Sequence, residues 1–206
     1  MQLSRPLAVV TPTLDGPALA ALALADESFT TGQLVRLLGH GSEEGIRKVL
    51  RRLTDQGIVT ADRVGAAFSY RLNRSHLAAE HIIGLANLRG ALLDKIEQML
   101  ASWPQPPIYA AVFGTATRGE MRVDSDIDIF LVRDDRSDEA TWRSQVDELM
   151  HAVTAWTGND TRPLEYTVSE LDAARDERVL VDITQTGLTV AGMRTWLNSR
   201  LRARQG

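Results

Sequence analysis

Residues 113–132 read FGTATRGEMRVDSDIDIFLV, and this stretch joins a glycine-bearing polar loop to an alternating apolar strand. In a β-strand, residues i and i+2 point to the same face, so the spacing predicts that Asp126 and Asp128 project side by side. The isoleucines that alternate with them then pack on the opposite face. Two adjacent carboxylates repel each other, and a divalent cation between them relieves the repulsion. Asp124 is predicted to be a solvated turn residue.

The loop ahead of this strand carries groups that suit a phosphate. Gly114 lets backbone N–H groups approach a phosphate closely, Thr115 offers a hydroxyl, and Arg118 offers a charged fork. Neither GxxxxGK[ST] nor GxGxxG occurs in the loop. Because Mg²⁺ is held by one or two carboxylates together with phosphate oxygens, loop and strand together predict a site for a metal ion and a nucleotide.

The segment closely resembles the signature of the nucleotidyltransferase superfamily, and in particular the minimal nucleotidyltransferases of antitoxin type. Gly114-Thr115 is followed by ten residues and then by Asp126 and Asp128 in an Asp-x-Asp pair. Threonine stands where the family usually has serine, which keeps the hydroxyl. The resemblance covers about residues 85–192 and implies an α/β fold with a small mixed sheet.

The same resemblance implies a role for each residue of the motif. Asp126 and Asp128 are expected to bind the metal, Mg²⁺ or Mn²⁺, and to act in catalysis. Gly114 and Thr115 are expected to hold the phosphates of an NTP, and Arg118 is expected to assist them. The expected NTP is ATP. The reaction is then in-line attack on the α-phosphorus with release of pyrophosphate.

The family usually adds a third acid on a later strand, which activates the incoming hydroxyl. Glu165, in PLEYTV at residues 163–168, is the only acid inside a strand-like run and is the predicted third catalytic residue. Family members more often have aspartate there. Asp160 and Asp182 stay open as alternatives.

Three helix-like segments and a hairpin make up the front of the chain, at residues 17–25, 30–38, 42–57 and 58–72. Ser42 is the expected N-cap of the third helix. Its apolar residues recur at i, i+3, i+4 and i+7, which predicts one buried face made of Ile46, Val49, Leu50 and Leu53.

This order of elements resembles the winged helix-turn-helix DNA-binding domains of bacterial regulators. The resemblance implies that the third helix enters the major groove of double-stranded DNA while the wing touches the backbone. The residues implied in DNA contact are Ser42, Arg47, Lys48, Arg51, Arg63 and Arg71. A protein-interaction module with a solvated basic face stays open as the alternative, because Glu43 and Glu44 disfavour DNA at the helix start.

The chain is therefore predicted to be an α+β protein in three parts. These are a winged helix-turn-helix domain at residues 1–75, a helical connector at 76–105 and a minimal nucleotidyltransferase domain at 106–206. The connector follows from a long helical stretch that stops at the proline cluster WPQPP. The same helix is a candidate for homodimer contacts.

Composition narrows the setting. The chain has 206 residues and no cysteine, which excludes disulfides and thiolate metal sites and favours a reducing cytoplasm. No apolar run approaches the roughly 18 residues that span a membrane, so no membrane partner is expected. The first 75 residues hold nine Lys and Arg against seven Asp and Glu, whereas the whole chain has a net charge of −4. A basic N-terminal part and an acidic remainder indicate that the two parts have different functions.

The expected function is Mg-dependent transfer of an NMP group from an NTP to an acceptor hydroxyl, with a protein side chain as one candidate acceptor. The winged helix then places the enzyme on DNA or makes it autoregulatory. The alternative is a DNA-binding transcriptional regulator whose nucleotidyltransferase-like domain only binds nucleotide as a signal. A third hypothesis is a toxin–antitoxin partner that works by binding.

Overall fold

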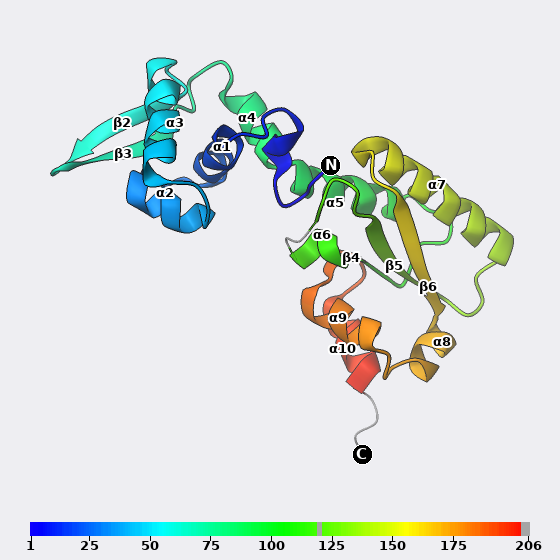
Figure 1. Cartoon of the computed structure of the whole chain (residues 1–206). Coiled ribbons are helices and arrows are strands. Elements are labelled where there is room, and N and C mark those ends of the chain that lie inside the picture. The colour runs from blue at the N-terminus through cyan, green and yellow to red at the C-terminus, as the bar shows by residue number, and fades with distance from the viewer. Residues whose placement is uncertain (119–120, 203–206) are drawn as a thin grey trace. The chain divides into compact units, whose positions relative to one another are not determined.

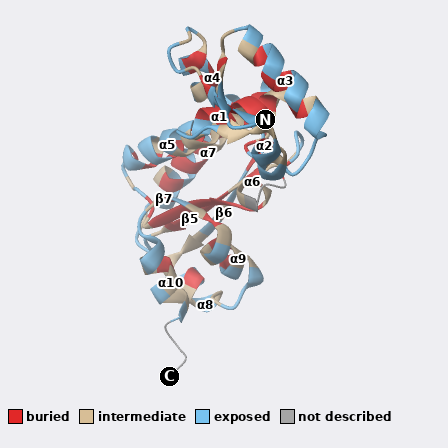
Figure 2. Cartoon of the chain, turned by 90° about the vertical axis from the view of Figure 1, so that its left-hand side faces the viewer, coloured by how far each residue is buried: buried red, intermediate tan, exposed pale blue. Residues whose placement is uncertain are grey.

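The computed structural model describes residues 1–118 and 121–202, with the side chain of Arg118 outside the description. The chain divides into two compact units, Ser4–Arg89 and Gly90–Gly206, with Gln2 in the first and Met1 and Leu3 in the second. Each unit has buried residues of its own (Figure 2). No helix in the described part of the chain combines the length and apolar character that crossing a bilayer requires.

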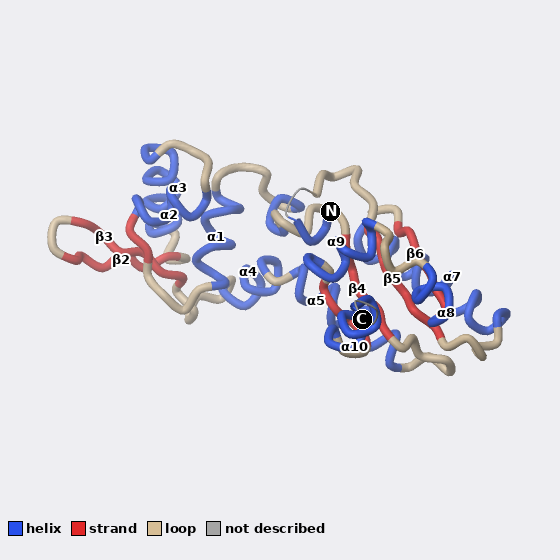
Figure 3. Tube along the Cα trace, turned by 90° about the horizontal axis from the view of Figure 1, so that it is seen from below, coloured by secondary structure: helices blue, strands red, loops and turns tan. Residues whose placement is uncertain are grey.

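The first unit is a winged helix-turn-helix fold, as predicted (Figure 1). Its elements are η1 (Pro6–Val9), α1 (Asp15–Leu24), β1 (Phe29–Thr30), α2 (Thr31–Leu38), α3 (Glu43–Asp55), β2 (Val59–Val64), β3 (Ala67–Leu72) and α4 (Ala79–Ala86). The strands form an antiparallel sheet in the order β1-β3-β2. Figure 3 shows β2 and β3 side by side and joined by a short loop, where Gly65 adopts a positive φ of 62°.

Local sequence explains where the helices of this unit begin and end. Thr30 caps α2 through a capping box with Gln33, and Gly39 ends the helix in the left-handed conformation. Ser42 caps α3 by accepting a hydrogen bond from the Gly45 amide over 3.1 Å. The predicted apolar face of α3 is confirmed, since all four of its members are buried: Ile46, Val49, Leu50 and Leu53.

The helical connector predicted at residues 76–105 is not a separate element in the structure. The stretch breaks after α4, and a second helix, α5 (Leu88–Ala101), follows. Ala79, Ile82 and Ala86 of α4 lie in the core of the first unit, whereas α5 supplies its buried leucines and isoleucine to the core of the second. The division between the two compact units falls at residues 89–90, inside the predicted connector.

The second unit is built on a mixed sheet with strand order β6-β5-β4-β7. Its further elements are β4 (Tyr109–Phe113), α6 (Thr115–Arg118), β5 (Ile127–Arg133), α7 (Glu139–Thr157), β6 (Thr161–Thr167), α8 (Val168–Ala173), α9 (Arg178–Thr186), β7 (Leu188–Ala191) and α10 (Arg194–Arg202). β4 is antiparallel to β5 and β7, and β5 is parallel to β6. The predicted α+β class with a small mixed sheet is confirmed.

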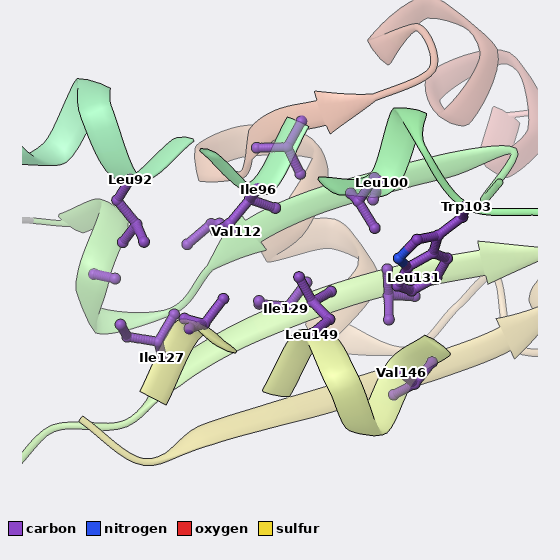
Figure 4. Packing of buried hydrophobic residues seen from close by; sticks show 14 of the residues in the cluster. Leu92, Ile96, Leu100, Trp103, Val112, Ile127, Ile129, Leu131, Val146 and Leu149 are labelled. Atoms are coloured by element: carbon purple, nitrogen blue, oxygen red, sulfur yellow. The ribbon is translucent and has the colours of Figure 1, made fainter. Parts of the chain in front are cut away.

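Helices cover the sheet on both faces. On one face, Ile127, Ile129 and Leu131 of β5 pack against α5 and α7, and Figure 4 shows Leu92, Ile96 and Leu100 of α5 and Val146 and Leu149 of α7 closing over them. On the other face, Phe130 and Val132 pack against residues of α8, α9 and α10, which are Leu171, Leu180, Ile183 and Leu197. Because β5 is buried on both faces, its apolar run is nearly continuous.

Candidate active site

The loop and the strand of the opening motif meet at one end of the sheet. β4 runs antiparallel to β5, with Phe113 opposite Asp128, so Gly114 follows directly beside this aspartate. Gly114 has a φ of 76°, and a Cβ atom at this position would overlap the Asp128 carboxylate. Two physical reasons therefore require glycine here, the left-handed backbone and the close approach of a carboxylate. Thr115 opens α6 and is half-buried.

The two aspartates lie as the alternation predicts. Asp128 shares its face of β5 with Phe130 and Val132, while the isoleucines belong to the core on the opposite face. Asp126 comes one residue before the strand, and both aspartates are half-exposed. Asp124 lies in an exposed turn, as predicted.

Glu165 does not join this pair, and its prediction as the third carboxylate is wrong. β6 pairs with β5 so that Glu165 lies beside Leu131, whose side chain belongs to the face covered by α5 and α7. Trp142 of α7 donates its indole N–H to Glu165 Oε2 over 2.6 Å on that same face. The sheet itself separates Glu165 from Asp126 and Asp128.

Arg162 occupies the face of β6 where the third acid was expected. It lies beside Asp128 in the register of the parallel strands. Its Nη1 atom is 2.8 Å from Asp126 Oδ2, and its Nε atom is 3.5 Å from Asp160 Oδ2. Arg162 is not among the predicted site residues, because the sequence predicts a strand that starts at Pro163, whereas β6 starts at Thr161.

The other two acids considered for the third position differ in their placement. Asp160 is exposed and pairs with Arg162, which also pairs with Asp126. Asp182 lies on α9, on the side of the sheet that Phe130 faces, and its Oδ1 accepts a hydrogen bond of 3.4 Å from the Thr186 hydroxyl. The side chain of Arg118, predicted to support the phosphates, lies outside the described residues.

Asn159 holds the segment that leads into Asp126, a role that no sequence pattern indicates. Its side chain is 2% exposed. The Nδ2 group donates to the carbonyl of Val123 over 3.1 Å and to the carbonyl of Ser125 over 2.8 Å. One side-chain amide therefore supplies hydrogen-bond donors to two backbone carbonyls of the loop that precedes the candidate metal ligand.

The side chains present suit a divalent ion held in part by a ligand. No group of three or more His, Cys, Asp or Glu side chains within residues 1–118 and 121–202 could hold a metal alone. Asp126 and Asp128 supply two carboxylates on one face, the number that Mg²⁺ commonly takes from protein when phosphate oxygens and water complete its shell. The residues therefore fit an ion that binds with a nucleotide.

Tyr166 also lies on the Asp128 side of β6, and its chemistry excludes it as a base. It donates its hydroxyl to Glu177 over 2.8 Å. Burial, the hydrogen bond to Glu177 and the negative charge of Glu177 raise the pKa of Tyr166 to about 12. This phenol stays protonated at neutral pH.

In the first unit, the candidate DNA residues lie on α3 and on the wing. Arg47 pairs with Glu43 at 2.6 Å and with Glu44 at 3.3 Å, and Lys48 lies 3.7 Å from Glu44. Arg51 is exposed and lines a groove together with Arg47 and residues of β3. Glu43 and Glu44 therefore neutralise part of the positive charge that DNA would otherwise meet.

The remaining candidates make short local contacts. Arg63 donates to the Gly65 carbonyl over 3.3 Å within the wing turn. Arg71 donates to the Thr60 hydroxyl over 3.2 Å across the strand pair. Ser42 uses its hydroxyl oxygen for the cap of α3. All three are exposed, so the structure brings every candidate DNA residue to the surface of this unit.

Residues 93–188 match the family model described as "Nucleotidyltransferase domain". This span contains the loop, both aspartates and Arg162. The matched region lies within the second unit and agrees with the resemblance of the opening motif. The chain joins this region to a winged helix-turn-helix unit.

Solved structures with a similar chain trace include toxin–antitoxin complexes. One, described as a toxin–antitoxin with AMP-PNP, is 18% identical with a TM-score of 0.38, and the match covers 53% of this chain and 80% of that one. Another, the AMPylated HEPN toxin of Shewanella oneidensis in complex with MNT antitoxin, is 16% identical with a TM-score of 0.36, covering 56% and 84%.

A third is TrmBL2, described as an archaeal chromatin protein with a novel mode of DNA binding. It is 17% identical with a TM-score of 0.29, and the match covers 89% of this chain and 73% of that one. TM-scores below 0.5 make these likenesses too distant to assign an activity or a partner. No curated protein matches the chain.

Proposed function

We propose that the second unit transfers a nucleoside monophosphate from an NTP, ATP by expectation, to an acceptor hydroxyl. The observation that carries this proposal is the contact of Gly114 with the Asp128 carboxylate inside the matched domain. This contact supports a site in which the glycine-bearing loop lies beside Asp128, with Asp126 two residues earlier. A triphosphate bound along the loop would then lie near both carboxylates, where a divalent ion would neutralise the charge of both groups.

The chain's own residues bind and orient the nucleotide. Gly114 lets the Asp128 carboxylate lie directly against the backbone of the loop, and the Thr115 hydroxyl is a hydrogen-bond donor at the start of α6. Asp126 and Asp128 would hold an Mg²⁺ or Mn²⁺ ion, which when bound neutralises charge on the phosphates and the leaving pyrophosphate. The side chains on the opposite face of β5 fix the strand by packing into a core.

The reaction balances as a displacement at phosphorus. The acceptor oxygen forms a bond to the α-phosphorus, the bond to the oxygen bridging the α- and β-phosphorus breaks, and pyrophosphate leaves with that electron pair. The acceptor hydroxyl gives its proton to a carboxylate, and we propose Asp160, which shares Arg162 with Asp126, for this role in the place of Glu165. A protein side chain remains our hypothesis for the acceptor, because the motif resembles antitoxin-type minimal nucleotidyltransferases.

Incubation with α-³²P-labelled NTPs and Mg²⁺ tests the proposal. The wild-type chain is expected to release pyrophosphate and to label a protein acceptor in a cell extract. Asp126→Asn is expected to lower both signals at least about tenfold, the smallest loss usual when support for a metal site is removed. The matched control is Asp124→Asn, which makes the same chemical change in the exposed turn two residues earlier.

Two outcomes would contradict the proposal. One is the absence of NTP binding by the wild-type chain, and the other is an equal signal from Asp126→Asn and Asp124→Asn. Glu165→Gln is an additional control, because its side chain lies on the opposite face. A loss of transfer in that variant without a loss of stability would return Glu165 to the site.

We further propose that the winged helix binds double-stranded DNA through α3. Arg47 and Arg51 are four residues apart on one exposed face and line the same groove. The acidic partners of Arg47 are themselves exposed, so these ion pairs are weak and yield to phosphate. A nucleotide-sensing regulator remains the second candidate function, since the same DNA contacts serve it without pyrophosphate release.

The variant Arg47→Ala/Arg51→Ala is expected to weaken binding to a short random-sequence duplex. Each lost phosphate contact should lower the slope of log K against log salt by about 1, which gives a fall of about 2 in the double variant. Fluorescence anisotropy at several salt concentrations measures this slope. Arg36→Ala, an exposed arginine of α2 in the same unit, is the control. An unchanged slope would show that Arg47 and Arg51 do not contact the DNA phosphates.

A further inference from the structure

Arg162 places a permanent positive charge among the carboxylates of the candidate active site. The guanidinium is paired with Asp126 at 2.8 Å and with Asp160 at 3.5 Å, and in the strand register it lies beside Asp128. Arginine keeps its proton at every physiological pH. The three carboxylates and the arginine together carry a charge of −2, and part of the attraction for a metal ion is already satisfied.

The fold of the second unit sets the position of Arg162, because the residue belongs to a paired strand. β6 is an edge strand of the sheet, which explains why Pro163 is tolerated inside it. The parallel pairing with β5 sets the faces of β6, so Arg162, Leu164 and Tyr166 lie on the side of Asp128. Of these three residues, Arg162 lies nearest the end of β6 that pairs with Asp128.

The geometry leaves donors for a further ligand. A guanidinium has five N–H donors, and the ion pairs of Arg162 with Asp126 and Asp160 involve Nη1 and Nε. The arginine side chain is 63% exposed, Asp126 29% and Asp160 68%. Ion pairs this exposed are weak, so the guanidinium can leave Asp126 for a stronger anion. A triphosphate is such an anion, and its oxygens match the planar fork of arginine.

A free divalent ion meets the opposite situation. It needs the oxygens of Asp126, which Arg162 already contacts, and its own charge repels the guanidinium. A metal ion without nucleotide must therefore displace the arginine and gains no phosphate oxygens in return.

We propose that Arg162 is a nucleotide-binding residue that serves as the resident cation of the site, excluding free metal ions from Asp126 and turning to the triphosphate when a nucleotide binds. This inference rests on the proposed function in that it assumes the site binds an NTP. Arg162 contacts the phosphates directly. The nucleotide consequently binds with measurable affinity in the absence of divalent metal.

The test measures two equilibria that the proposal moves in opposite directions. Mn²⁺ alone is titrated into the full chain and followed by electron paramagnetic resonance, and ATP is titrated in EDTA by calorimetry. Arg162→Met keeps the length of the side chain and removes its charge. It is expected to raise Mn²⁺ affinity and lower metal-free ATP affinity, each about tenfold, the scale of one opposite charge acting within about 4–6 Å.

Two further variants make the outcome decisive. Arg162→Lys restores the charge and is expected to recover most of both wild-type affinities, and it covers the case in which Arg162→Met does not fold. Arg143→Met is the matched control, because Arg143 is an exposed arginine paired with Glu139 on α7 of the same unit. It should leave both affinities unchanged.

The failures of the two proposals can be told apart. If ATP binds neither in EDTA nor with Mg²⁺, the proposed function fails. If ATP binds with Mg²⁺ but not in EDTA, or if Arg162→Met leaves either affinity unchanged or moves both in the same direction, the role of Arg162 is overturned. Opposite shifts in Arg162→Met, together with recovery in Arg162→Lys, support it.

Discussion

Replacing Gly114 with alanine is expected to abolish nucleotidyl transfer while the second unit stays folded. The added Cβ overlaps the Asp128 carboxylate, so this side chain must move away from the position it has beside the loop. A displacement of about 1 Å at a reacting site costs about a hundredfold in rate. The left-handed backbone adds about 1–2 kcal/mol of instability for a residue with a Cβ. Labelled-NTP transfer and thermal unfolding measure the two effects.

Gly158 provides the matched control for this variant. It ends α7 with a φ of 72°, close to the 76° of Gly114, and nothing lies within 4 Å of a Cβ built there. Gly158→Ala should therefore lose a similar amount of stability and keep its nucleotidyl transfer. If both glycine variants lose transfer equally, backbone strain explains the loss and the contact with Asp128 has no special role.

The pair of carboxylates was predictable from the sequence because it depends on local geometry. Alternation along a strand fixes which residues share a face, and the burial of Ile127 and Ile129 follows from the same rule. The buried face of α3 is predictable for a similar reason, since its period is that of one helix. In both cases the information lies within about ten residues.

The prediction of the third carboxylate failed because this position depends on a pairing between strands that are distant in the sequence. Alternation says that Glu165 faces away from Arg162 and Leu164, but it does not say which set faces the aspartates. Only the register of β6 on β5, with Asp128 beside Arg162, decides this. A shift by one residue would exchange the two faces and bring Glu165 to the face of Asp128. Sequence alone carries no signal for this register.

The prediction of a separate helical connector failed for a different physical reason. Residues 76–102 have good helix formers throughout, and Gly84 and Gly90 are tolerated within helices, so local propensity favours one continuous helix. The structure breaks the stretch at Asn87, where the apolar residues on either side belong to two different cores. Tertiary packing decides the break, and propensity could not place it.

Asn159→Asp is expected to destabilise the second unit by about 2–3 kcal/mol and to weaken nucleotide binding. The carboxylate has the shape of the amide but no N–H group, so the carbonyls of Val123 and Ser125 lose their donor and face a negative charge. Each partly buried polar group left without its partner costs about 1–3 kcal/mol. Because these carbonyls belong to the segment that leads into Asp126, the loss of their clamp should spread to the candidate metal ligand.

Asn73→Asp separates this local effect from a general loss of stability. Asn73 also donates its Nδ2 group to a backbone carbonyl, that of Gly57, over 2.9 Å, but it lies in the winged helix unit. It should lower thermal stability and leave ATP affinity at the wild-type value. If Asn159→Asp is destabilised yet binds ATP as tightly as the wild type, the loop before Asp126 is held by other contacts. Reduced ATP affinity in Asn159→Asp alone would make Asn159 a positioning residue for the carboxylate pair.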